Sequence, residues 1–384
     1  MISLINDTIN KNDVEELIDW LKTNPRLTKG PLTKEFEKLW ASWLGSKYSV
    51  FVNSGSSANL LMLYTMIESS RIKNRKIAIP NLCWATDLAP AIQLGYEPIL
   101  VDCNLDNLSV DLEHLEKIFI EESPSVLLFV SVLGLVPDMD KIVDLCKKYD
   151  VILLEDNCES MGSKYKDSHL GTFGLMSTFS TYFGHHISTI EGGMVCTDDE
   201  DIYNLLLSIR SHGWDRDWDK EEQTKIREKN GISEFDALYT FYFAGMNLRS
   251  TDLQAFLGIN QLKKINNIFI KRNRNYKLYQ KYLSGDFWKP KELENVFTSN
   301  FAYPIIDEKR NEIIKVLQQN SVEVRPLICG SMHSQPFFRN KLKQSVNDFT
   351  NTTKINKFGL YLPNHPDLTE QNIKFICDLI NEVK

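Results

Sequence analysis

The 384-residue chain lacks a long apolar run and a surplus of positive charge. Its apolar runs are short, such as residues 151–154, whereas a membrane span needs about 20 apolar residues. The first residues, MISLINDTINKND, are polar and acidic, unlike a secretory signal. A formal net charge of -7 offers no basic stripe to nucleic acid or to an anionic membrane. We therefore expect a cytoplasmic protein that binds neither.

Clustered cysteines are also missing. The seven cysteines form no CxxC pair and lie far apart in the sequence, at Cys83, Cys103, Cys146, Cys158, Cys196, Cys329 and Cys377. An odd, dispersed set favours reduced thiols and argues against a zinc or iron–sulfur site. We expect no bound metal and no iron–sulfur cluster.

Strand and helix patterns alternate over the first two thirds of the chain. Helical spacing of apolar residues predicts helices at 13–24 and 33–44 on either side of the Gly30-Pro31 break. Predicted strands at 48–54, 76–80, 97–102, 125–132 and 150–156 then alternate with predicted helices at 58–67, 86–94, 111–119 and 139–149. Nearly continuous apolar strands that alternate with helices are typical of a parallel sheet covered on both faces.

The pattern changes after Arg249. A long helix of mixed charge is predicted at about 251–284, followed by short strands in FAYPII and VEVRPL and a terminal helix at 369–382. We expect a large α/β domain at 1–254 and a smaller α+β domain at 255–384.

Two segments at predicted strand ends carry residues suited to ligand binding. Small residues in SGSSAN (54–59) would let backbone N–H groups approach an anion before a helix, although a turn with a helix N-cap explains them equally well. Asp156, in LEDNCES, ends a strand where a parallel sheet forms its ligand crevice, and a buried carboxylate there needs a cation. Asp156 could hold a protonated ring nitrogen or cap the next helix.

The third segment, FSTYFGHHISTIEGGM (179–194), contains the adjacent histidines His185 and His186. In an extended stretch adjacent side chains point to opposite sides, so at most one of the two faces a given pocket. A metal site would need a second ligand cluster, which the sequence does not offer. For either histidine, a structural and a catalytic role both remain open.

Together with NLCWATD, RSHGW, GMNLRSTDLQA and VEVRPL, these segments follow an order that resembles the sugar aminotransferase family typified by DegT, DnrJ, EryC1 and StrS, over nearly the whole chain. The resemblance implies the aspartate aminotransferase-like fold (fold type I of the pyridoxal 5'-phosphate, or PLP, enzymes), with a mostly parallel sheet in the large domain. In that family a lysine that binds PLP covalently lies five residues after a serine and six before the glutamate of EGG. Ser180 and Glu191 keep this spacing, but the residue between them is His185, and no lysine occurs between Lys166 and Lys220.

An imidazole can shuttle a proton but cannot hold PLP covalently. Histidine in GHHISTIEGG is similar to the sugar 3-dehydratases of the family, above all those that act on GDP-4-keto-6-deoxy-D-mannose in colitose synthesis. The resemblance implies that L-glutamate converts PLP to pyridoxamine 5'-phosphate (PMP), which condenses with the sugar 4-keto group. Loss of the C3 hydroxyl, followed by hydrolysis of the resulting enamine and imine, then gives a 3,6-dideoxy-4-keto sugar and ammonia. His185 is the expected base, since an ordinary histidine has a pKa of about 6.5, and His186 is expected to be structural.

The resemblance also assigns the remaining site residues. Cofactor contacts fall on Gly55, Ser56, Ser57, Trp84, Asp156, Glu159, Ser180 and Asn247, and substrate contacts fall on His212, Arg249 and Arg325. Trp84 would stack on the pyridine ring, unless it is a core tryptophan. Glu159 would lie near the ring hydroxyl. Asn247 would reach the partner's cofactor phosphate across a homodimer with shared active sites. Either arginine could bind glutamate or the nucleotide phosphates, or be a surface residue.

Three alternatives stay open. A related CDP-sugar dehydrase also has this histidine but uses a cysteine-held iron–sulfur cluster, which dispersed cysteines cannot supply. A 4-aminotransferase could use another lysine, such as Lys29 or Lys220. An inactive protein could keep the fold as a binding module, although the retained Trp84, Asp156 and Ser180 argue against decay. CDP-, UDP- and dTDP-linked sugars remain possible substrates, and the expected pathway is synthesis of a surface polysaccharide such as lipopolysaccharide O-antigen.

Overall fold

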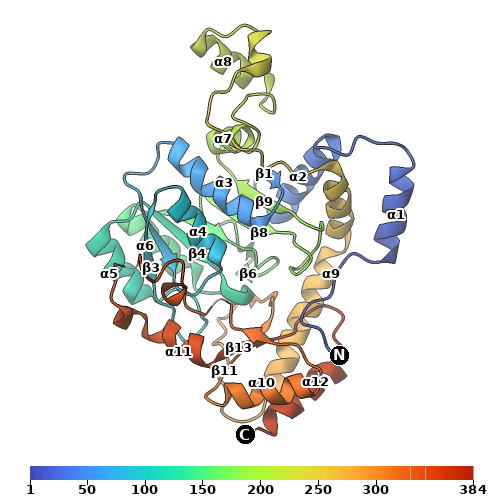
Figure 1. Cartoon of the computed structure of the whole chain (residues 1–384), viewed down its shortest axis with the longest axis vertical. Helices are drawn as coiled ribbons and strands as arrows, with labels where there is room; N and C mark the ends of the chain where they lie inside the picture. Colours follow the sequence, from blue (N-terminus) through green and yellow to red (C-terminus); the bar gives the residue numbers. More distant parts are fainter. Residues whose placement is uncertain (329, 342, 384) are drawn as a thin grey trace.

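The computed structural model describes residues 1–328, 330–341 and 343–383, so Cys329 lies outside the described residues. A seven-stranded sheet forms its centre, in the order β1-β9-β8-β5-β4-β2-β3 (Figure 1). The strands are β1 (Tyr48–Val52), β2 (Lys76–Pro80), β3 (Glu97–Val101), β4 (Val126–Val130), β5 (Ile152–Asp156), β8 (Met176–Ser180) and β9 (Gly193–Thr197). Strand β9 runs antiparallel to both of its neighbours, and β3, β2, β4, β5 and β8 are parallel. The expected mostly parallel α/β sheet is therefore confirmed.

Helices cover both faces of this sheet. They are α3 (Gly55–Glu68), α4 (Ala85–Gln93), α5 (Leu112–Glu122), α6 (Met139–Tyr149) and α7 (Glu200–Arg210). All five residues of β4 are buried, and they alternate between two cores. Leu127 and Phe129 pack with residues of α5 and α6, whereas Leu128 packs in the core that contains residues of α3, α4 and α7. Burial on both sides explains why this strand is continuously apolar.

A 31-residue helix, α9 (Asp252–Tyr282), passes from the large sheet to the C-terminal part of the chain. Its first half packs on α2 (Pro31–Leu44), which follows α1 (Lys11–Leu21). Gly258 allows the two helices to approach closely, because a Cβ atom there would lie 2.4 Å from the ring of Phe36. The second half contributes Tyr276 and Tyr279 to the same core as the C-terminal helix α12 (Glu370–Asn381). The predicted domain boundary at 254/255 falls in the first turn of α9 and stays a prediction.

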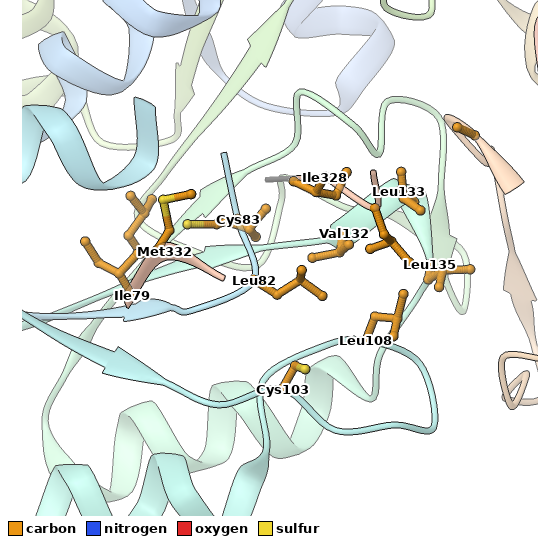
Figure 2. Packing of buried hydrophobic residues seen from close by; sticks show 14 of the residues in the cluster. Ile79, Leu82, Cys83, Cys103, Leu108, Val132, Leu133, Leu135, Ile328 and Met332 are labelled. Carbon is orange, nitrogen blue, oxygen red and sulfur yellow. The ribbon is translucent and has the colours of Figure 1, made fainter. Parts of the chain in front are cut away.

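The C-terminal part contains a small antiparallel sheet. Its strands, in the order β11-β13-β12, are β11 (Tyr303–Ile306), β13 (Gly359–Leu362) and β12 (Arg325–Pro326), accompanied by α10 (Arg310–Gln319) and α11 (Thr350–Phe358). Figure 2 shows Ile328 and Met332 packed among Leu82, Cys83 and Leu133, which follow β2 and β4. The C-terminal part therefore lies over the carboxyl ends of the large sheet's strands.

Three peripheral features complete the fold. A second small sheet joins β10 (Val296–Phe297), β6 (Lys164–Tyr165) and β7 (Ser168–His169). Helix α8 (Lys220–Asn230) projects from the body beyond α7 (Figure 1). The N-terminal segment lies against the C-terminal part, where the Ile2 amide donates to the Ser321 carbonyl at 2.8 Å and Ile2 pairs with Val322. No helix in the described ranges combines the length and apolar character that a membrane crossing requires.

Candidate active site

A cavity of about 470 Å³ lies at the carboxyl ends of β4, β5 and β8. Seven of the residues predicted from the sequence line it together, namely Gly55, Ser56, Trp84, Asp156, Glu159, Ser180 and His185. They come from four separate segments of the chain that the sheet brings to one edge. This is the crevice in which open parallel sheets bind ligands.

The start of α3 forms one wall of the cavity. Ser54 is the N-cap, and its Oγ accepts from the Ser57 amide at 3.0 Å and donates to the Ser57 Oγ at 2.9 Å. Ser57 thus supports the helix end and does not line the cavity, whereas Gly55 and Ser56 do. A Cβ atom on Gly55 would lie 2.7 Å from the Cβ atom of Ser180, so only glycine keeps this cradle open.

Asp156 is the last residue of β5 and is almost fully buried. Its Oδ2 accepts from Asn59 Nδ2 at 2.6 Å and its Oδ1 from the Cys158 amide at 2.8 Å. The next element after Asp156 is strand β6, and no helix begins between them, so the helix-cap alternative for Asp156 is wrong. Its carboxylate instead faces the cavity, where no lysine or arginine of the described chain lines the wall.

Trp84 and Glu159 line the same cavity as Asp156. Trp84 precedes α4 and is 54% exposed, so the alternative of a core tryptophan is wrong. Glu159 Oε2 accepts from the Leu133 amide at 2.8 Å. Burial raises the pKa of the Glu159 carboxyl to about 8, and the nearby charge of Asp156 acts in the same direction. Glu159 therefore carries a proton at neutral pH.

His185 reaches the cavity from the loop between β8 and β9. Its ring lies 5.3 Å from the Phe301 ring, and its buried Nδ1 has no hydrogen-bond partner in the described chain. Burial lowers the pKa of His185 to about 4; Asp156 opposes this change and Arg272 reinforces it. The imidazole is neutral at pH 7 and can accept a proton.

His186 points elsewhere. It is fully buried, and its Nε2 lies 3.0 Å from the Ser299 carbonyl oxygen. The ring also contacts the aromatic rings of Phe269 and Phe301. Only one of the two adjacent histidines faces the cavity, as the sequence predicts.

The predicted substrate residues and Asn247 lie outside this cavity. Arg249 Nε donates to Asn247 Oδ1 at 3.0 Å, and Arg249 Nη2 lies 3.4 Å from His212 Nε2. These three residues form a separate polar group near the base of the α8 projection. Arg325 is exposed on β12 and donates from Nη1 to the Val324 carbonyl at 3.0 Å.

Neither alternative lysine reaches the cavity. Lys29 Nζ pairs with the carboxylate of Asp217 at 2.7 Å, beside the buried Arg210. Lys220 is the exposed first residue of α8. In the part of the chain that the structure describes, no lysine lines the cavity.

Sequence reasoning missed several cavity residues. They include Ile5, Asp87, Tyr182, Phe301, Ile328 and Tyr361. Asp87 follows Trp84 in a segment already singled out, so its acidic side chain was a usable signal. Ile5 and Tyr361 come from opposite ends of the chain, and nothing local marks them.

A mostly parallel sheet whose strand ends form a ligand cavity under a smaller C-terminal sheet defines an aminotransferase-like α/β enzyme. The family comparison agrees, because the DegT/DnrJ/EryC1/StrS aminotransferase family model matches residues 7–381. The chain belongs to this family of PLP-dependent, sugar-modifying enzymes.

Individual relatives refine the comparison. GDP-4-keto-6-deoxy-D-mannose 3-dehydratase of Yersinia pseudotuberculosis is 34% identical, over 97% of this chain and 95% of its own. A crystal structure of GDP-4-keto-6-deoxymannose-3-dehydratase with a trapped PLP-glutamate geminal diamine superposes with a TM-score of 0.90 at 30% identity, covering 99% of this chain and 100% of that one. GDP-perosamine synthase of Escherichia coli O157:H7 is 26% identical, over 97% of this chain and 94% of its own.

Proposed function

We propose that the protein is a lyase that removes the C3 oxygen of a nucleotide-linked 4-keto-6-deoxy sugar, using PLP/PMP and L-glutamate. The proposed substrate is GDP-4-keto-6-deoxy-D-mannose, and the products are a 3,6-dideoxy-4-keto sugar, 2-oxoglutarate from L-glutamate, and ammonia. One observation carries the proposal: His185 lines the cavity at the position where the family pattern has lysine. The similarity to two 3-dehydratases supports the choice of sugar.

The residues of the cavity fit PLP. The glycine cradle at Gly55, with Ser56 and Ser180, suits a phosphate at the start of a helix. The buried Asp156 carboxylate suits a protonated pyridine nitrogen. Trp84 offers an exposed ring for stacking, and the protonated Glu159 can donate to the ring hydroxyl. When bound, the cofactor supplies an amine and an electron sink.

His185 supplies the proton transfer. Its unpartnered Nδ1 and lowered pKa leave a neutral imidazole in the cavity, ready to take a proton and return it. The Arg272 Nη2 donates to the His185 carbonyl at 3.3 Å and holds the main chain in place. Because imidazole forms no covalent bond with PLP, contacts with the cradle, Trp84 and Asp156 must retain the cofactor.

We further propose a homodimer with shared active sites. Asn247, Arg249 and His212 form a polar group outside their own chain's cavity, as expected of residues that serve the partner's site. Beside them, the projection exposes the apolar side chains of Phe235, Leu238, Tyr239 and Phe241. A second copy of this chain would cover this surface. Arg249 and Arg325 are the proposed contacts for glutamate and the nucleotide phosphates.

The test is incubation of the purified protein with PLP, L-glutamate and GDP-4-keto-6-deoxy-D-mannose. Ammonia and 2-oxoglutarate are measured while mass spectrometry follows the sugar, with His185→Asn as the control. Loss of the C3 oxygen with release of ammonia, abolished in the control, is the expected result. A 4-amino sugar without ammonia would establish a transaminase instead, and failure to bind PLP or PMP would leave a binding module.

A further inference from the structure

Asp87 brings a second buried carboxyl group into the cavity, beside Asp156. It is the third residue of α4 and is 1% exposed. Its Oδ2 accepts from the Trp84 amide at 2.9 Å, and its Oδ1 accepts from Asn59 Nδ2 at 3.1 Å. The same Asn59 amide donates to Asp156 Oδ2 at 2.6 Å. One amide nitrogen on α3 thus bridges the two carboxyl groups.

The orientation of the Asn59 amide is fixed from its other side. Thr178 Oγ1 donates to Asn59 Oδ1 at 2.6 Å, so the nitrogen must face the carboxyl groups. Neither Asp87 nor Asp156 forms an ion pair with lysine or arginine in the described chain. Two adjacent, buried carboxylates without a cation cannot both stay ionised, so the pair holds a proton.

The charges around Asp87 place that proton on it. Burial raises the pKa of Asp87 well above its usual range, and the charge of Asp156 and a hydrogen bond to it act in the same direction. The other titratable groups that face the pair are Glu159, Cys158 and, towards Asp156, His185. None of these supplies a positive charge at neutral pH.

We propose that Asp87 is a positioning residue for the cofactor ring: it ties the Asp156 carboxylate, Asn59 and the Trp84 main chain into one network, and in the cofactor-free protein it holds one proton against Asp156. The inference rests on the proposed function, because it assumes that Asp156 meets a pyridinium nitrogen. Arrival of that cation stabilises negative charge next to Asp156. Asp87 then gives up its proton to solvent more easily than in the cofactor-free protein.

Asp87→Asn separates positioning from titration. Asparagine keeps an acceptor for the Trp84 amide and a donor for Asp156; it loses the acceptor that Oδ1 offers to Asn59 Nδ2, and it has no titratable proton. Calorimetric titration with PLP at pH 7, in two buffers of different ionisation enthalpy, counts the protons released. We expect Asp87→Asn to bind PLP within about threefold of wild type but to release fewer protons, whereas Asp87→Ala binds about tenfold more weakly.

Asp111→Asn is the matched control, because Asp111 caps α5 with a 2.9 Å bond to the His114 amide and does not line the cavity. It should match wild type in affinity and in proton count. Equal proton release from wild type and Asp87→Asn would overturn the inference while leaving the proposed function intact. If wild type bound no PLP, the proposed function itself would fail, and this inference with it. The proton count from Asp87→Asn remains decisive even if the alanine variant does not fold.

Discussion

At the scale of single residues, burial sets the protonation states in the cavity. The pKa of His185 is lowered from an ordinary 6.5 to about 4, so the imidazole is neutral well below pH 6.5. We expect the acid limb of kcat/KM to lie below pH 6, and His185→Asn to lower kcat by about 100-fold or more. A pH series of initial rates checks both. An acid limb at pH 6.5 that tracks His185 would contradict the buried, neutral histidine.

The pKa of Glu159 is shifted in the opposite direction, upward, and this shift makes the stability of the folded protein depend on pH. The pKa is raised from 4.5 to about 8, so between these values the folded protein holds a proton that the unfolded chain has released. This contribution to stability is therefore lost as pH rises through that window. In the cofactor-free protein, Glu159→Gln should gain about 1–3 kcal/mol over wild type between pH 5 and pH 9. Urea unfolding at the two pH values measures the difference, and a constant offset would contradict it.

The sequence predicts those site residues that stand in recognisable segments at strand ends. Asp156 and Ser180 are the last residues of β5 and β8, where the register of a strand fixes which side chain reaches the cavity, whereas His185 lies in the loop after β8 and follows from its spacing to Ser180 and Glu191 in the family pattern. Ser57 lies one position too far into α3, where it serves the N-cap. Trp84 could not be told from a core residue until its exposure was known. Ile5 enters the cavity only through tertiary contacts, which no local pattern encodes.

At the scale of elements, the start of α3 leaves room for a phosphate because Gly55 has no side chain. Gly55→Ala would place a methyl group against Ser180, and we expect PLP to bind about tenfold more weakly because the cradle is filled. Ser57→Ala is the control. It removes a hydrogen bond between two hydroxyl groups at the same helix end, and Ser57 does not line the cavity. Absorbance titration with PLP compares the two. Unchanged affinity in Gly55→Ala would exclude the cradle as the phosphate site.

Element prediction succeeds where periodicity is long and fails where it is short. Helix α9 is predicted at about 251–284 and observed at Asp252–Tyr282, where Thr251 and Gln254 form a capping box. The two-residue strands β6 and β7 have no period to detect, whereas β12 lies within the predicted stretch VEVRPL. Strand β9 is fully buried like its neighbour β8, and nothing in its composition reveals that it runs in the opposite direction. Only the connection from β8 sets that direction.

At the scale of the whole molecule, α9 joins two cores. Ala255 and Ile265 pack with α2, whereas Tyr276 and Tyr279 belong to the core shared with the C-terminal sheet. Because α9 is continuous, unfolding of either half would expose apolar side chains in both parts of the molecule. We expect a single calorimetric unfolding transition of the cofactor-free protein, with equal calorimetric and van't Hoff enthalpies. Two resolved transitions would show that residues 1–254 and 255–384 unfold separately.

The proposed dimer predicts complementation between inactive variants. Asn247 serves the partner's cavity in this arrangement, so a mixed dimer of His185→Asn and Asn247→Ala subunits keeps one intact site. Mixing the two variants after mild dissociation should restore about one quarter of wild-type activity. A mixture of His185→Asn with Ser180→Ala is the control, since both residues line the same chain's cavity. No recovery in the first mixture would place Asn247 outside the shared site.

The position of Ile5 has a consequence for the order in which the site is made. Ile5 lines the cavity, and the neighbouring Leu4 amide donates to Glu323, 319 positions along the chain. A ribosome therefore synthesises this wall residue before the large sheet and its anchor after that sheet. The growing chain can form most of the large sheet early, but it cannot close the cavity until the C-terminal strands have emerged. Binding competence should arrive abruptly, once those C-terminal strands have emerged.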